Sequence, residues 1–222
     1  MKAITPQINR RNFIRTTATI TTGLVGLSGL NQTAEANIST ENKSLYFIGP
    51  MEGYSPQIGT LVSMMNYMRD SVINSVKKLS KAELDHLYDA NSNSIGSLIL
   101  HLGATEKFYQ INTFEGRQEF NDAETKMWGA PMSLGDEGRK VIKGQEVKYY
   151  LDAITEVRAK TLQEFKNKDD QWLMALDPAW SKPGADLNTY WKWFHVCEHE
   201  SNHRGQIKWL MSRLPGAKPS KD

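Results

Sequence analysis

Apolar residues recur at intervals of three and four along most of this chain, which is the spacing of one face of an α-helix. The first such stretch begins after Ser55, and Pro56 stands where the first turn of a helix tolerates proline. Alternating apolar and polar residues, typical of β-strands, are nearly absent, and no such run is longer than residues 43–48. This pattern restricts the chain to an all-α fold. The apolar residues of the first stretch are Ile58, Leu61, Val62, Met65, Met68, Val72, Ile73 and Val76.

The same spacing predicts three more long helices farther along the chain. They span about residues 95–114, 146–168 and 187–214. Four long helices without a sheet predict a helical bundle, which we place at residues 54–216. We expect residues 37–53 to lead into this bundle and residues 217–222 to form a loose tail.

Shorter segments connect the predicted long helices. Ser80 and Glu83 have the spacing of a capping box, which predicts a short helical turn, and residues 169–176 predict another. Residues 117–144 are polar and contain several glycines and a proline, so we expect a long irregular loop there. Residues 178–186 predict a second loop. Long ordered loops often carry function.

The first 36 residues have the three parts of an export signal in the usual order. Arg10 and Arg11 precede Phe13 and resemble a twin-arginine signal. An uncharged stretch follows over residues 16–30, and a small-x-small pattern ends at Ala36. The uncharged stretch is too short and too polar for a stable membrane span. We therefore expect an exported protein, periplasmic or otherwise extracytoplasmic, cleaved after Ala36.

Charge and cysteine content exclude several classes of function. The chain has 27 Lys and Arg against 25 Asp and Glu, a net charge of +2, so nucleic acid is not an expected partner. Cleavage after Ala36 would remove four basic residues and one acidic residue and leave a net charge of −1. The single cysteine, Cys197, excludes an intrachain disulfide and cysteine-rich zinc sites. Histidines and carboxylates would have to hold any metal.

Three histidines form a stripe on the last predicted helix. His195, His199 and His203 are spaced four residues apart, so neighbours lie about 6 Å apart along the axis and the outer two about 12 Å apart. One neighbouring pair could therefore chelate a metal ion, and the third histidine would do something else. His101 lies in the apolar Leu98–Leu102 segment of another helix and is the candidate third ligand. A hydrogen-bonded core histidine is the alternative interpretation.

Two motifs resemble those of a known family. Residues 193–207 contain HxxxHxxxHRGQ and are similar to the last-helix signature of the DinB-like (YfiT-like) superfamily. Residues 94–106 are similar to its second-helix signature, SIxxLxxHL with a downstream glutamate. The resemblance implies an up-down-down-up four-helix bundle, usually a homodimer. It also implies that His101, His199 and His203 bind a divalent metal ion.

Zn, Ni, Fe or Cu would suit three imidazole ligands that leave a position open for water or substrate. Glu106, Arg204 and His195 are candidates for residues that support this site. Glu106 could orient a ligand or pair with Arg204, and Arg204 could anchor an anion, although solvated or ion-paired helix residues are the alternative. We expect Cys197 to face away from the stripe and pack.

Characterised relatives in this superfamily include thiol-cofactor-dependent S-transferases and a maleylpyruvate isomerase. The resemblance therefore favours a metal-dependent enzyme with a small-molecule substrate, S-transferase-like or hydrolase-like. Export favours hydrolysis, because reduced thiol cofactors belong to the cytoplasm. A non-catalytic, stress-related metal-binding protein and a bundle held together by a structural metal remain the alternative functions.

Overall fold

The computed structural model describes residues 44–218, and these fold into helices. The expected export signal, the start of the lead-in segment and the last four residues lie outside this range. Residues 44–55 contain no helix. No helix in the described range is long and apolar enough to cross a membrane. The long helices are α2 (Pro56–Val76), α4 (Ile95–Phe114), α7 (Val147–Phe165) and α9 (Thr189–Met211).

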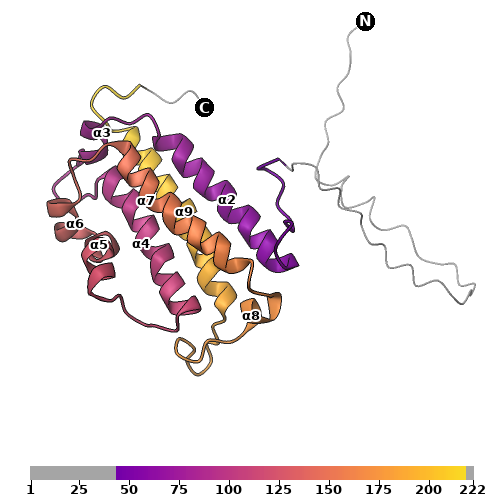
Figure 1. Ribbon diagram of the computed structural model, residues 1–222. Helices are drawn as coiled ribbons and strands as arrows, with labels where there is room; N and C mark the ends of the chain where they lie inside the picture. The colour runs from indigo at the N-terminus through magenta and orange to yellow at the C-terminus, as the bar shows by residue number, and fades with distance from the viewer. Residues whose placement is uncertain (1–43, 219–222) are drawn as a thin grey trace, which may run out of the picture. The chain divides into compact units, whose positions relative to one another are not determined.

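The four long helices form a bundle of the predicted up-down-down-up kind (Figure 1). Helices α2 and α9 run in one direction, and α4 and α7 run in the other. Helix α4 packs against α7 on one side and against α9 on the other, while α2 packs against α9 and α7. Because α4 and α7 are parallel neighbours, the chain between them must return along the length of the bundle.

The return segment corrects the prediction of an irregular loop over residues 117–144. It contains α5 (Asp122–Ser133) and α6 (Gly135–Val141). Asn121 and Glu124 form a capping box that starts α5, and Trp128 packs into the core. Glycines and Pro131 gave the segment the composition of a loop. The proline lies near the end of α5, where few helical hydrogen bonds follow it.

Short helices close the ends of the bundle at the predicted turns. Ser80 and Glu83 form the capping box of α3 (Lys81–Asp85). Asp169 caps α8 (Asp170–Met174) through a 2.7 Å hydrogen bond from the Trp172 N–H. Lys192 on α9 anchors the loop between α8 and α9. Its side chain is fully buried and forms an ion pair with Asp177, a residue of that loop.

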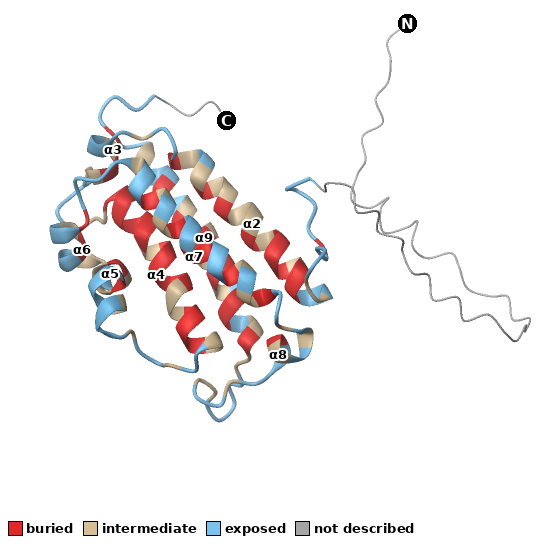
Figure 2. Ribbon diagram, viewed as in Figure 1, coloured by how far each residue is buried: buried red, intermediate tan, exposed pale blue. Residues whose placement is uncertain are grey.

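Burial follows the inward sides of the long helices (Figure 2). The core has two apolar clusters, one toward each end of the bundle. One contains Val72, Ile99 and Ile207, and the other contains Phe165 and Trp193. On every long helix, the residues of one cluster precede those of the other along the chain. A charged layer lies between them.

Each long helix contributes one charged residue to this layer: Arg69 from α2, Glu106 from α4, Arg158 from α7 and Glu200 from α9. All four are at most 5% exposed. Arg69 donates to Glu200 at 2.8 Å and to Glu106 at 2.6 Å. Arg158 donates to Glu106 at 2.8 Å and to Glu200 at 3.0 Å. Two positive and two negative charges therefore cancel inside the bundle, and we call these four residues the ionic layer.

Glu106 thus belongs to the ionic layer and does not take the predicted role of orienting a ligand or pairing with Arg204. Thr161 adds a 2.6 Å hydrogen bond to its carboxylate. Burial alone would raise the pKa of Glu106, but Arg158, Arg69 and Thr161 together lower the pKa below its usual value. Glu106 is therefore a charged structural residue.

Removing one member of the ionic layer should destabilise the protein strongly, because its partners would remain buried and charged. We expect Arg158→Met to lower the free energy of unfolding by about 3–5 kcal/mol, measured by urea denaturation. Lys148→Met is the control, since its pair with Asp152 is exposed and should cost at most about 1 kcal/mol. Equal losses in both variants would contradict the structural role of the layer.

Candidate metal centre

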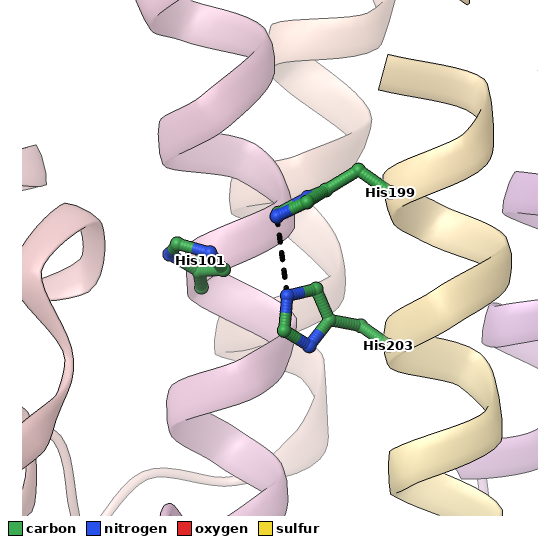
Figure 3. Close-up of side chains that lie close together, drawn as sticks. All are labelled: His101, His199 and His203. Carbon is green, nitrogen blue, oxygen red and sulfur yellow. Dashed lines mark hydrogen bonds between the residues drawn. The ribbon is translucent and has the colours of Figure 1, made fainter. Parts of the chain in front are cut away.

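The structure brings His101, His199 and His203 together between α4 and α9 (Figure 3). One potential ligand atom from each lies within 4.8 Å of the other two. The Nε2 atoms of His199 and His203 are 3.2 Å apart. The ring of His101 is 4.9 Å from that of His199 and 5.0 Å from that of His203, measured between centroids. The three histidines that the family resemblance implied as metal ligands therefore lie together in the fold.

Hydrogen bonds orient two of the three imidazoles. His101 donates from Nδ1 to the carbonyl oxygen of Pro131 on α5 at 2.8 Å. A carbonyl only accepts, so Nδ1 carries the hydrogen and Nε2 keeps its lone pair. His203 Nδ1 lies 3.2 Å from Oε1 of Gln206, one turn farther along α9. Both contacts leave Nε2 free to bind a metal, an arrangement typical of histidine ligands.

The three imidazoles are held in the neutral form that metal binding requires. Burial lowers the pKa of His199 to about 3, with smaller contributions from His203, His101 and His195. Burial and the neighbouring His101 lower the pKa of His203 to about 4. Burial also lowers the pKa of His101, although its bond to Pro131 acts in the opposite direction. All three rings therefore offer lone pairs at neutral pH.

The spacing of these nitrogens fits a transition-metal ion. Zn–N bonds of about 2.0–2.1 Å in a tetrahedral site place the nitrogens about 3.3 Å apart. The 3.2 Å between His199 and His203 meets this requirement. The ligand nitrogen of His101 lies within 4.8 Å of the other two, so its side chain would move closer on binding the ion. No fourth His, Cys, Asp or Glu joins this group within residues 44–218, so the donor set suits an ion with an open position.

The other candidates from the sequence lie outside this triad. The ring of His195 stacks on Trp191, and its Nδ1 is 2.9 Å from the hydroxyl of Tyr109. Arg204 is partly buried, and its side chain has no ion-pair partner within the described part of the chain. Cys197 is buried, as predicted, and burial raises the pKa of its thiol to about 11.

Sequence reasoning missed the groups that orient the ligands. The Pro131 carbonyl belongs to a helix that was predicted as a loop, and a backbone acceptor leaves no signal in residue identity. Gln206 could have been identified from the sequence, because it ends the HRGQ motif. It also donates a hydrogen bond to Asn202, four residues earlier, at 3.4 Å. The contact between Tyr109 and His195 depends on how α4 and α9 pack, so no local sequence pattern predicts it.

A family model described as mycothiol-S-transferase matches residues 60–216. The chain belongs to the mycothiol-S-transferase family. This family is DinB/YfiT-like, so the resemblance found in the two motifs is confirmed. The match spans all four long helices of the bundle except the first turn of α2.

A solved structure of a conserved protein from Enterococcus faecalis has a similar fold, with a TM-score of 0.54 and 13% sequence identity. The similarity covers 69% of this chain and 94% of that chain. At this identity the likeness supports the fold alone. No curated protein matches this chain.

Gln206 should strengthen metal binding by holding His203 in place. We expect Gln206→Leu to weaken Zn²⁺ affinity about 10- to 100-fold, measured by competition with a chromophoric chelator. Gln163→Leu on the exposed side of α7 is a matched control and should leave the affinity unchanged. Unchanged affinity in Gln206→Leu would show that the hydrogen bond to His203 does not support metal binding.

The lowered pKa values of the triad predict acid sensitivity of the metal-free protein. Above the ordinary histidine pKa of 6.5, the rings are neutral in both the folded and unfolded states and contribute no pH dependence. Below it, the unfolded chain takes up protons that the folded protein does not, so the free energy of unfolding falls as the pH drops from 6.5 toward 4.

Urea denaturation of the metal-free protein at several pH values measures this dependence. A variant with His199→Asn and His203→Asn has no imidazole to protonate at these positions. It should lose part of the slope between pH 6.5 and pH 4. An identical slope in both proteins would contradict the lowered pKa values.

Proposed function

We propose that this protein is a metal-dependent thiol S-transferase whose divalent ion is held by His101, His199 and His203. The observation that carries this proposal is the triad of neutral imidazoles, without a fourth protein ligand in residues 44–218. Membership of the mycothiol-S-transferase family supports it independently. An open position next to three histidines suits a catalytic ion better than a structural one.

The residues of the chain have distinct tasks in this reaction. The Pro131 carbonyl and Gln206 orient His101 and His203, so that their Nε2 atoms converge. Burial keeps the rings unprotonated. When bound, the ion stabilises the thiolate form of a substrate thiol and makes it nucleophilic at neutral pH.

The reacting sulfur comes from a small-molecule thiol. Cys197, the only cysteine, is buried, and its raised pKa keeps it a thiol at neutral pH. It therefore lacks both the access and the charge of a protein nucleophile. A low-molecular-weight thiol and an electrophile are accordingly the two substrates of the proposed reaction.

A purely structural metal is less well supported. The ionic layer already links α4 to α9 through buried contacts to both arginines. The triad lies beside this connection and joins the same two helices. The bundle therefore has a link between these helices that needs no metal.

The N-terminal signal and the homodimer implied by the resemblance belong to the proposal too. Export by itself favours hydrolysis, because reduced thiol cofactors belong to the cytoplasm, so an exported S-transferase would need a thiol supplied outside it. The basic pair Arg10 and Arg11 and the uncharged stretch after it support export.

Metal content and thiol transfer test the proposed function together. We expect about one divalent ion per chain by mass spectrometry, lost in His101→Ala and His199→Ala, because the triad spans two helices. The Zn²⁺-loaded protein should accelerate the reaction of mycothiol or cysteine with monochlorobimane, in which the sulfur displaces chloride, and the variants should not. His86→Ala, which changes a histidine outside the triad, is the control. Equal rates in His101→Ala and the unaltered protein would refute the proposed role of the metal.

A further inference from the structure

His195 lies one helical turn before His199 and outside the triad. The centroids of these two rings are 5.2 Å apart. The ring of His195 lies parallel to that of Trp191, with an interplanar angle of 3° and centroids 5.2 Å apart. It meets Tyr109 edge to face at 5.8 Å. Its side chain remains 31% exposed, so a fixed imidazole faces solvent next to the candidate metal centre.

The hydrogen bond to Tyr109 determines which nitrogen of His195 carries the hydrogen. Within residues 44–218, His195 Nδ1 is the only hydrogen-bond partner of the Tyr109 hydroxyl, at 2.9 Å. Tyr109 is 4% exposed, so a hydroxyl hydrogen without an acceptor would be costly to bury. The hydroxyl therefore donates to Nδ1, and the hydrogen of the neutral ring lies on Nε2.

The surroundings of Nε2 indicate what this N–H can bind. Within residues 44–218, the nearest carboxylate oxygen comes from Glu198 and is 4.0 Å away, too far for a hydrogen bond. Its negative charge disfavours an anionic ligand at the same place. Trp191 is 45% exposed and offers a flat apolar surface beside the imidazole. A neutral group with a hydrogen-bond acceptor and an unsaturated, planar body fits this combination.

We propose that the Nε2–H of His195 binds the carbonyl oxygen of a neutral, unsaturated electrophile, with Tyr109 as the residue that positions His195. This inference rests on the proposed thiol transfer and names the class of its second substrate.

In the reaction, the thiol loses its proton to solvent and its sulfur bonds to the β-carbon of the electrophile. The π electrons of the carbon–carbon double bond move toward the carbonyl oxygen, where the N–H of His195 stabilises the enolate charge. Water then protonates the α-carbon.

The hydrogen on Nε2 can be tested in the metal-free protein, without any activity. Long-range ¹H–¹⁵N correlation spectra distinguish the two neutral forms of a histidine ring. We expect His195 to carry its hydrogen on Nε2, and Tyr109→Phe to shift the ring toward a mixture of both forms. Tyr149→Phe, at a half-exposed tyrosine on α7, is the control. A hydrogen on Nδ1 in the unaltered protein would overturn the inference.

Binding of acetophenone, followed in the same spectra, tests the ligand class. Acetophenone should shift the Nε2 resonance of His195, whereas ethylbenzene, which lacks the oxygen, and benzoate, which is anionic, should bind at least several-fold more weakly. Equal binding of ethylbenzene would refute the hydrogen bond to oxygen. Tighter binding of benzoate would refute the preference for a neutral ligand.

Selectivity between two electrophiles tests the role in transfer. With the Zn²⁺-loaded protein, His195→Phe should lower kcat/KM for cyclohex-2-enone relative to that for benzyl chloride about tenfold, the effect of one lost hydrogen bond. Zinc content should not change. An unchanged ratio would overturn the inference. Absence of transfer from the unaltered protein to either electrophile, with the expected Nε2 hydrogen and acetophenone binding intact, would instead refute the proposed function and leave the carbonyl site in place.

Discussion

The ionic layer fixes how the long helices lie along one another. Arg69, Glu106, Arg158 and Glu200 come from four different helices, and each glutamate accepts from both arginines. Sliding one helix by a turn would separate buried charges, which costs several kcal/mol. Glu106 is five residues from His101, and Glu200 is adjacent to His199. The register that satisfies the layer is therefore the one that places His101 opposite the two histidines of α9.

Helix α9 combines structural and chemical roles because its faces meet different surroundings. Glu200 is buried in the core, while His199 and His203 face His101 on α4. Trp191 and His195 are half-exposed. His195 lies about one turn before His199, and Trp191 lies about two turns before it. A helix repeat of 3.6 residues separates neighbouring residues by about 100°, so such close sequence neighbours serve different functions.

Local sequence patterns predicted the long helices well, because apolar spacing depends only on residues within a few turns. The spacing alone left open which pair of histidines on α9 could act together, and the resemblance to a family selected the pair. Glu106 was misassigned because its partners, Arg69 and Arg158, are 37 and 52 residues away in sequence. Helix α5 was missed because Pro131 and the glycines indicate a loop, while the burial of Trp128 depends on the assembled bundle.

The charge balance of the ionic layer also explains how ionised and neutral side chains coexist at adjacent positions. A lone buried carboxylate at position 200 would favour a protonated imidazole at position 199. The two arginines offset both glutamates, and burial together with the neighbouring rings dominates at His199. The same helix can then hold Glu200 charged for stability and His199 neutral for binding metal.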